Sequence, residues 1–570
     1  MMRRLRQLLS AGQLSEDGFV EITAIYNNVA YAFLYLESNE THIDYSTVLP
    51  WRRLFYEDRE LDAQLLSAVR ALRCFDSEVE RSREAFVEYL QQRREAPESA
   101  ARDEMDDLMA REKALLAESE QAQSDFLGRL GVCGPGRPSV PFYKLVSSTA
   151  DPTKRRKLTT VWIRVRDRNL DDLVTLVDET IAVRRRNARD RGYDTPLAAT
   201  LTRSRVDEST AATYLDQYLE LAMESHRRLT EKIGHVLGTD GDVAADFGFY
   251  VRQIIGPTLV PTFDLSACLD FAFAAAQITF GLVLRRVPTD NNDVIVVDAE
   301  RDGEHVGKIT FDLWDDERRS RLANTTRGLR NRTEWGEIVQ YPVAYVACRF
   351  RHDGEAQPRI NFQNMHSLFH ETGHAVNHLL IRRRLPNQSG LEYLPLERLE
   401  NLSMWFEKWV YHPDFATYVA PDENSARGLA TAQRVKFLEY QRTHVDRAVT
   451  AALDFEAHRD GSGGLSDAFD KLDERWRISQ YCSLGDFPPY FTWPMFQANP
   501  GANFAYLWGA ADSAAKFEPL MARPLTSVGS DPTDDLFAPC FDFELPSEPP
   551  DPTAVFRFYD RPFAPIGRTS

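Results

Sequence analysis

The stretch Phe369–His374 reads F-H-E-T-G-H, with two histidines four positions apart and a glutamate directly after the first. Residues i and i+4 lie on one face of a helix, so both imidazoles can reach one metal ion. A carboxylate beside them is suited to take a proton from a metal-bound water. Apolar residues recur at helical spacing on both sides of the stretch. We therefore predict a metal-binding helix, with His370 and His374 as ligands and Glu371 as the general base.

A catalytic zinc ion needs a third protein ligand and one open coordination position. The downstream segment Leu396–Val410 has a helical pattern and contains Glu400, and the break Pro386–Gly390 separates it from the first helix. If the two helices pack antiparallel, Glu400 lies over the histidine pair. Gly373 costs its helix about 1 kcal/mol relative to Ala, which suggests that a neighbouring element packs closely there. We expect Glu400 to be the third ligand.

These motifs resemble those of the thimet oligopeptidase and oligopeptidase F family of zinc metallopeptidases. In that family an F-H-E-x-G-H run is followed by a Glu ligand in an E-x-x-S-x-x-x-E-x-W segment, matched here by Glu400, Ser403, Glu407 and Trp409. The resemblance implies a mainly α-helical, zincin-type fold, with two helical halves around a deep channel and a small β-sheet beside the H-E-x-x-H helix. It also implies one Zn²⁺ per chain.

The residues and the resemblance together predict a zinc metalloendopeptidase of the oligopeptidase type. Such an enzyme hydrolyses internal peptide bonds of short peptides through a zinc-activated water, with Glu371 as general base. The alternative left open is a specialised zinc enzyme of the same fold that matures or tailors one peptide-derived metabolite. Glu407 lies on the same predicted helix face as Glu400 and is expected to hydrogen-bond a ligand histidine, unless it is a surface carboxylate.

The reason for keeping the alternative is a departure from the family pattern near the C-terminus. The family has a His before a Y-L-W run, and further tyrosines that bind the oxyanion and the substrate backbone. The Y-L-W run is present here and begins at Tyr506, but Pro494 stands at the position of the His and Asn503 at that of a Tyr. The resemblance therefore carries over one catalytic tyrosine, Tyr506, and Tyr490 is a candidate substitute for substrate binding.

A small sheet is predicted just before the metal-binding helix. Three segments are rich in β-branched and aromatic residues, namely Val294–Val297, His305–Trp314 and Gln340–Phe350. An edge strand in such a sheet can pair with an extended peptide through main-chain hydrogen bonds. Tyr345 and Val346 of the third segment are therefore expected to contact the substrate, unless the sheet has no substrate role.

The domain organisation is expected to follow the chain in three regions. Residues 1–150 form an N-terminal helical region, residues 151–290 a helical region that lines the channel, and residues 291–570 the catalytic zincin region with the C-terminal helices. A Gly- and Pro-rich loop, Gly131–Pro141, lies close to the first boundary.

The composition excludes several classes of protein. The 570 residues are 43% hydrophobic and 27% charged, which fits a globular chain, and the net charge of −18 gives no electrostatic footprint for nucleic acid. The six cysteines are scattered, without a C-x-x-C pair. The N-terminus is a poor signal peptide, and no apolar run reaches about 18 residues. We expect a cytoplasmic protein that acts on short peptides or peptide-derived substrates, without nucleic-acid or membrane partners, and leave its oligomeric state open.

Overall fold

The chain forms two compact units, each assembled from three segments. The first unit comprises Met1–Ala96, Pro261–Ala426 and Lys516–Ser547, and the second Pro97–Val260, Arg427–Ala515 and Glu548–Ser570. The computed structural model describes residues 1–10, 13–38, 50, 52, 55, 58–95, 99–132, 137–256, 261–291, 293–315, 324–351, 357–492, 499–527, 530–543 and 547–561. The three consecutive regions expected from the sequence stay a prediction.

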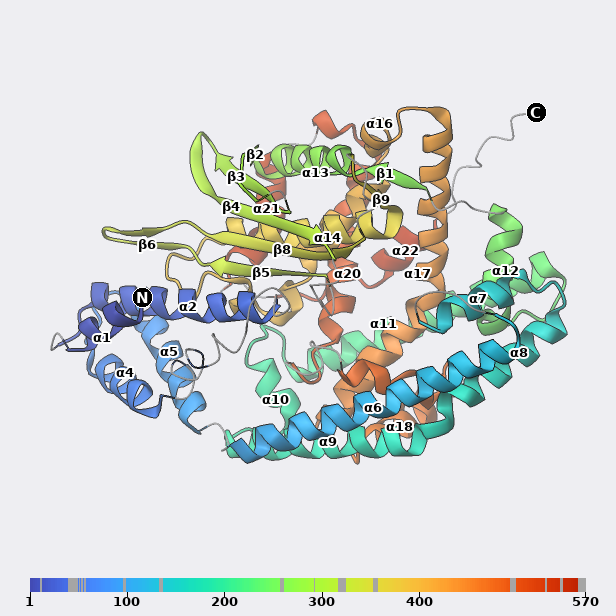
Figure 1. Ribbon diagram of the computed structural model, residues 1–570, viewed down its shortest axis with the longest axis horizontal. Helices are drawn as coiled ribbons and strands as arrows, with labels where there is room; N and C mark the ends of the chain where they lie inside the picture. Colours follow the sequence, from blue (N-terminus) through green and yellow to red (C-terminus); the bar gives the residue numbers. More distant parts are fainter. Residues whose placement is uncertain are drawn as a thin grey trace. The chain divides into compact units, whose positions relative to one another are not determined.

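The first unit combines helices with a small sheet (Figure 1). Its described α-helices are α1 (Met2–Ser10), α2 (Glu16–Ser38), α4 (Arg59–Ala71), α5 (Ser77–Glu95), α13 (Leu265–Phe280), α14 (Phe362–Leu380), α15 (Asn401–Phe406), α16 (Phe415–Val419) and α21 (Ser530–Phe541). Its strands are β1 (Thr262–Asp264), β2 (Leu282–Val287), β3 (Ile295–Arg301), β4 (Glu304–Trp314), β5 (Thr325–Arg330), β6 (Thr333–Trp335), β7 (Ile338–Gln340), β8 (Val343–Phe350) and β9 (Arg359–Asn361).

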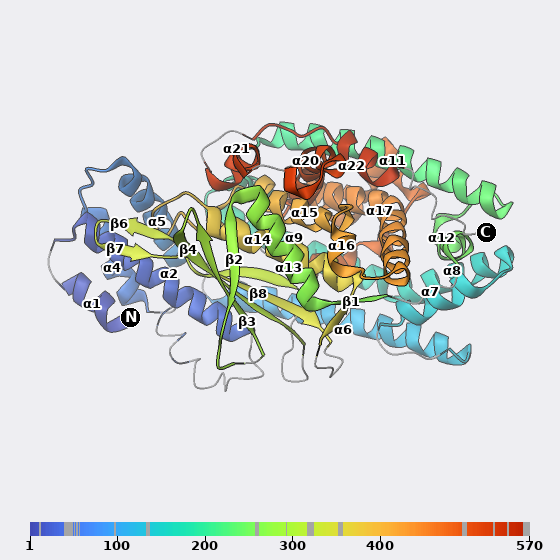
Figure 2. The ribbon, with the colours of Figure 1, turned by 90° about the horizontal axis from the view of Figure 1, so that it is seen from above.

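Five strands form the main sheet, in the order β2-β3-β4-β8-β5. The pair β4 and β8 is parallel, and the other neighbours are antiparallel. The metal-binding helix α14 packs against β4, β5 and β8, and α13 runs beside β2 (Figure 2). The prediction of a mainly helical protein with a small sheet beside the H-E-x-x-H helix is thus confirmed.

The sequence predicted three strands of this sheet and missed two. The predicted segments correspond to β3, β4 and β8, whereas β5 and β2, which follows the helix α13, were not predicted. That helix, α13, ends at Phe280 because Gly281 adopts the left-handed conformation, with φ 65°, which glycine reaches without a steric penalty. The residues after Gly281 are therefore free to form a strand.

The described residues of the second unit form helices and loops, without a strand. Its α-helices are α6 (Ser99–Arg129), α7 (Ser139–Ser148), α8 (Pro152–Arg166), α9 (Leu170–Asp190), α10 (Pro196–Leu201), α11 (Glu208–Leu237), α12 (Val243–Ile255), α17 (Glu423–His458), α18 (Leu465–Trp476), α20 (Phe504–Phe517) and α22 (Thr553–Asp560). Several begin at a side-chain cap, such as Asp207 before α11 and Asp242 before α12, which bonds the first free N–H groups.

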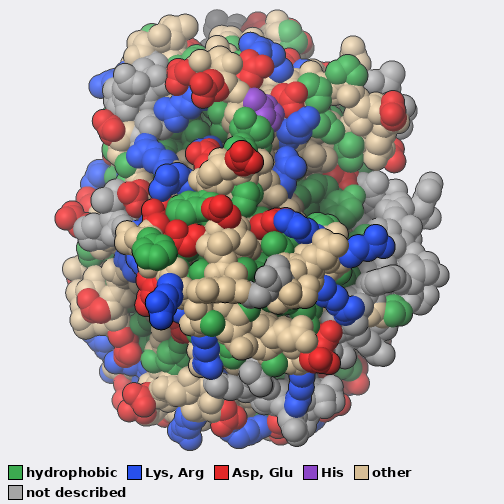
Figure 3. All heavy atoms as spheres, turned by 90° about the vertical axis from the view of Figure 1, so that its left-hand side faces the viewer, with side chains coloured by type: hydrophobic (Ala, Val, Ile, Leu, Met, Phe, Trp, Pro, Cys, Tyr) green, Lys and Arg blue, Asp and Glu red, His purple; other side chains and the backbone are tan. Residues whose placement is uncertain are grey.

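On the face shown in Figure 3, acidic and basic side chains are interspersed. The expected channel between two halves stays a prediction.

Candidate metal centre

The histidine pair projects from the middle of α14. Asn361 caps the start of α14, because its side chain accepts a hydrogen bond from the backbone N–H of Asn364, and the next nineteen residues are helical. Four-residue spacing places the rings of His370 and His374 together, with centroids 4.9 Å apart. The side chains are 21% and 10% exposed, so the pair is reached from solvent but largely enclosed.

Glu400 meets both histidines from the start of α15. Its Oε2 lies 3.3 Å from Nε2 of His370 and 3.3 Å from Nε2 of His374. The Ser403 hydroxyl donates a 2.9 Å hydrogen bond to the same oxygen and so orients the carboxylate. Ligands about 2.0–2.1 Å from a tetrahedral zinc ion stand roughly 3.3 Å apart, which is the separation observed. Two imidazole nitrogens and one carboxylate oxygen are also a ligand set that zinc takes in catalytic sites, so these residues fit the metal.

Gly373 allows α15 to approach this closely. A Cβ atom added at Gly373 would lie 2.6 Å from the Ser403 Cα and 2.8 Å from the Phe406 Cβ, closer than van der Waals contact allows. The close packing inferred from a glycine in mid-helix is therefore present, and it brings Glu400 and Ser403 next to the histidines.

Glu407 stands on the far side of the His370 ring. Its Oε2 is 3.2 Å from Nδ1 of His370 and 3.8 Å from Nδ1 of His366, and Nζ of the buried Lys408 lies 4.0 Å from its Oε1. A hydrogen bond from Nδ1–H to Glu407 leaves Nε2 of His370 as the free lone pair that faces Glu400. The contact that the sequence led us to expect is present, and the alternative of a surface carboxylate does not fit a side chain that is 7% exposed.

Charges in the centre act strongly on one another. Burial raises the pKa of the Glu400 carboxyl, but the His374 charge and hydrogen bonds from both histidines outweigh burial and hold it well below its usual range. Burial disfavours the charged form of His370 and so lowers its pKa. The hydrogen bonds to Glu400 and Glu407 outweigh burial and raise this pKa well above the ordinary value. The centre therefore attracts positive charge, and a divalent cation competes with protons for it.

Glu371 points toward the sheet and is held by a residue that the sequence did not suggest. The Thr326 hydroxyl, on β5, lies 2.8 Å from Glu371 Oε2 and 2.9 Å from the Glu371 backbone oxygen, so it can donate to either. The Glu371 residue is only 6% exposed. Strand β5 reads T-T-R-G-L-R, without the apolar alternation that marks a strand, so no sequence signal placed Thr326 here.

Tyr345 and Val346, the predicted substrate contacts, do not lie at a free strand edge, and their contact with substrate stays a prediction. They lie in β8, which is paired on both sides, with Thr310 and Phe311 of β4 and with β5. Both residues are buried, and the Tyr345 hydroxyl donates a 2.6 Å hydrogen bond to Asp312. Sequence periodicity identified a strand, but it does not give the order of strands within a sheet. The outer strand beside β8 is β5.

The two predicted tyrosines belong to the second unit. Tyr506 is partly buried in the first turn of α20, and Tyr490 lies in a short 3-10 helix, Pro488–Thr492. Burial and the charges of Asp446 and Asp486 raise the pKa of Tyr490. Their roles stay predictions, and Pro494 lies outside the described residues.

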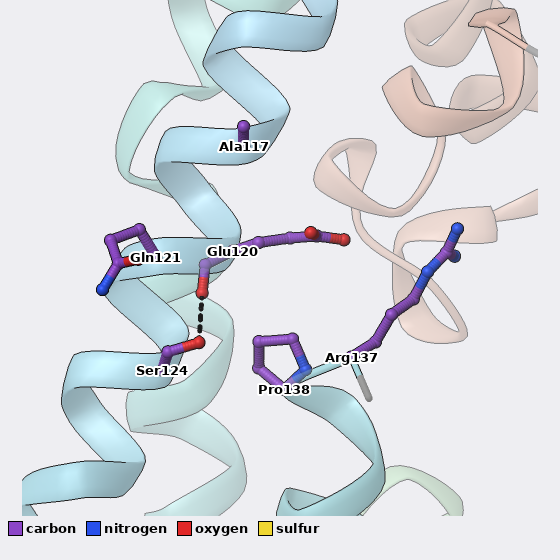
Figure 4. A pocket seen from close by; sticks show the side chains of 6 residues that line it. All are labelled: Ala117, Glu120, Gln121, Ser124, Arg137 and Pro138. Atoms are coloured by element: carbon purple, nitrogen blue, oxygen red, sulfur yellow. Dashed lines mark hydrogen bonds between the residues drawn. The ribbon is translucent and has the colours of Figure 1, made fainter. Parts of the chain in front are cut away.

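A surface pocket in the second unit contains none of the predicted site residues. Figure 4 shows it between α6 and the residues just before α7, with the side chains of Glu120 and Arg137 extending into the same space. The Ser124 hydroxyl donates a 3.0 Å hydrogen bond to the Glu120 carbonyl. Elsewhere, within the described part of the chain, no helix is long and apolar enough to cross a bilayer.

Comparison with known proteins places this centre in a peptidase family. The model of Peptidase family M3 matches residues 145–485, more than half of the chain, including the candidate ligands. Oligopeptidase A of Escherichia coli K12 is 23% identical over 193 residues, which cover 32% of this chain and 28% of that protein. Oligopeptidase A of Haemophilus influenzae is 20% identical over 372 residues, which cover 60% of this chain and 55% of that protein. The matches thus span less than two thirds of these relatives.

Solved structures share the fold over nearly the whole chain. PZ peptidase A, solved with an inhibitor, superposes with a TM-score of 0.54 at 10% identity, covering 95% of this chain and 92% of that one. A structure assigned to oligoendopeptidase F of Bacillus anthracis strain Ames gives a TM-score of 0.53 at 12% identity, covering 95% and 90%. The family-model match, together with the H-E-x-x-H helix and its paired glutamate, leads to one conclusion: this chain belongs to peptidase family M3.

Proposed function

We propose that this protein is a zinc-dependent metallo-oligopeptidase that hydrolyses internal bonds of short peptides. The observation that carries the proposal is the meeting of His370, His374 and Glu400, with Glu371 on the adjoining face of the same helix. The proposed complement is one Zn²⁺ per chain. Family membership supports a peptidase, and the names of the relatives support an oligopeptidase.

When bound, zinc lowers the pKa of a coordinated water and polarises the carbonyl that is attacked. Glu371 would take a proton from the attacking water and deliver it to the leaving amine. When the Thr326 hydroxyl donates to Oε2, Oε1 of Glu371 is the oxygen left to take the proton. Glu407 fixes the tautomer of His370 so that Nε2 faces the metal position. Tyr506, carried over from the family pattern, donates a hydrogen bond to the developing oxyanion, and Tyr490 contacts the substrate.

Strand β5 is our candidate for pairing with the substrate, in place of β8. It is the outer strand of the main sheet and carries Thr326, the partner of Glu371. A peptide that added a strand at this edge would lie alongside the proposed general base. We propose no nucleic-acid or membrane partner for this protein.

We also propose a cytoplasmic location. A probable cytosolic oligopeptidase A of Arabidopsis thaliana, 25% identical over 245 residues, supports it. The alternative is an enzyme dedicated to one peptide-derived metabolite. The altered segment around Asn503 is the reason for considering it, and no further observation favours it.

The proposal is tested by metal content and peptide cleavage, measured together on the full chain. We expect one zinc per chain and cleavage of a mixed library of short peptides, lost in Glu371→Gln with the zinc retained. Glu300→Gln is the matched control, because Glu300 is a carboxylate on β3 that pairs with Arg285 away from α14. Stoichiometric zinc without cleavage of any library member would refute the oligopeptidase activity.

A further inference from the structure

A single buried carboxylate holds the turn that precedes Tyr506. Asp454, on α17, is fully buried. Its Oδ1 accepts a 3.0 Å hydrogen bond from the backbone N–H of Gly501, and its Oδ2 accepts bonds of 3.2 and 3.0 Å from the backbone N–H and side-chain amide of Asn503. The Asn503 carbonyl in turn accepts a 3.1 Å bond from the backbone N–H of Tyr506. Asp454 therefore holds the turn just before α20 and fixes the residue that leads into Tyr506.

Asn503 is engaged inward and not toward a ligand. Its side-chain nitrogen donates to Asp454, and the residue is 8% exposed. The asparagine that replaces a family tyrosine is therefore part of the internal support of the turn. Its amide and backbone together supply two of the three hydrogen bonds that reach Asp454 from this segment.

His458 and Arg184 hold Asp454 from its other side. Nε2 of His458 lies 3.0 Å from Nη1 of Arg184, and because a guanidinium can only donate, Nε2 must accept. The proton of the neutral ring then sits on Nδ1, which faces the backbone oxygen of Asp454 at 2.8 Å and its Oδ1 at 3.1 Å. Burial lowers the pKa of His458 and so favours this neutral form. A donor therefore faces an acceptor at each contact in the series from Arg184 through His458 to Asp454.

Two acidic residues act on the buried Arg184. Arg184 is buried, and the charges of Asp454 and of Glu112, a buried residue on α6, both act on it. Four titratable groups thus lie in the interior of the second unit, although a core of apolar residues would be simpler to stabilise. Networks of this kind orient one group with little freedom, because each member is fixed by its neighbours.

We propose that Asp454 is a positioning residue for peptide hydrolysis: through the turn Gly501–Asn503 it sets the position of the Tyr506 hydroxyl. His458 and Arg184 keep the carboxylate in the orientation that the turn requires. The inference rests on the proposed role of Tyr506 as a donor to the oxyanion. Such a donor stabilises a transition state only if it is held in place before the reaction, so a rigid support beneath it has a direct effect on kcat.

The test is a double-mutant cycle between Asp454→Asn and Tyr506→Phe in the zinc-loaded full chain, with an internally quenched library of short peptides as substrate. We expect Asp454→Asn to lower kcat about 10- to 100-fold with a smaller change in KM, because misplacing a catalytic group by about 1 Å costs that much. In the Tyr506→Phe background the same substitution should change kcat less than twofold. Zinc content should stay at one per chain in all four proteins.

The matched control is Asp246→Asn, which neutralises another fully buried carboxylate of the second unit, one paired with Arg155. It should lower stability without any coupling to Tyr506→Phe. If Asp454→Asn does not fold, Asn503→Ala, which removes one of the three hydrogen bonds, takes its place in the cycle.

Each outcome separates the inference from the proposed function. Equal losses of kcat from Asp454→Asn in both backgrounds would show that Asp454 acts independently of Tyr506, and would overturn the inference alone. An unchanged kcat in Tyr506→Phe would remove the proposed role of Tyr506, and the inference with it, while zinc-dependent cleavage stands. No cleavage by the unmodified protein would overturn both.

Discussion

Nδ1 of His370 lies 3.2 Å from Oε2 of Glu407, while Nε2 of the same ring lies 3.3 Å from Oε2 of Glu400. The imidazole is thus held between two carboxylates, one at the metal position and one behind it. The carboxylate behind a ligand histidine fixes its tautomer and strengthens it as a donor to the metal.

Glu407→Gln should weaken zinc binding by about 10- to 100-fold, because the neutral amide no longer places a negative charge behind His370. The dissociation constant is measured by competition with a chelator of known affinity. Glu400→Gln, which removes a ligand, should weaken binding much further. Equal affinities for the unmodified protein and Glu407→Gln would show that Glu407 does not tune the ligand.

Thr326→Val should lower kcat about 10- to 100-fold and leave the zinc content unchanged. A hydrogen bond to a charged group contributes about 1.5–3 kcal/mol, and its loss frees Glu371 from its fixed orientation. Thr326→Ser keeps the hydroxyl and should retain most of the activity. If Thr326→Ser falls as far as Thr326→Val, then the methyl group and its packing matter instead of the hydrogen bond.

Gly373→Ala should destabilise the first unit by about 1–3 kcal/mol and lower its zinc affinity, because a Cβ would overlap Ser403 and push α15 away. Thermal unfolding and zinc titration measure the two effects. Gly128→Ala on α6 is the control, since a Cβ there meets nothing within 4 Å and should gain up to about 1 kcal/mol of helix stability. A stable, zinc-binding Gly373→Ala would contradict the observed packing.

Zinc should raise the melting temperature of the metal-free protein, and a chelator should reverse the shift. Ligand at 100 times its dissociation constant stabilises the native state by about 2.7 kcal/mol, provided that the unfolded chain does not bind it. His374→Ala, which lacks one of the three ligands, should show a much smaller shift at the same zinc concentration. An equal shift in both proteins would place the binding elsewhere.

Because of Glu112, the free energy of unfolding should fall as the pH rises. Burial raises its pKa from 4.5 to about 7, opposed in part by the charge of Arg184. Between these values the folded protein keeps a proton that the unfolded chain releases, so the stabilising contribution is present below pH 4.5 and lost by about pH 7.

Glu112→Gln cannot release that proton. Relative to the unmodified protein, it should therefore gain about 1–3 kcal/mol of stability at pH 8 and little at pH 4. Chemical unfolding at the two values compares the proteins. A difference that does not vary with pH would mean that Glu112 has an ordinary pKa.

Local spacing in the sequence determined the candidate ligands. His370 and His374 share a helix face by periodicity alone, and Glu400 was found because a catalytic zinc ion requires a third ligand and a second helix offers one. Those inferences involve residues close together along the chain, where helical geometry fixes the direction of a side chain. The same holds for the prediction that Gly373 marks a close helix contact.

Only the tertiary structure decided which strand lies at the edge of the sheet, and which distant residues support the reacting groups. Tyr345 and Val346 were expected at a free edge, but β5, which has no clear strand signal, pairs there and brings Thr326 to Glu371. Asp454 and Asn503 meet by packing of α17 against the turn before α20. Contacts between residues far apart in sequence depend on how elements are ordered and packed, which residue periodicity does not encode.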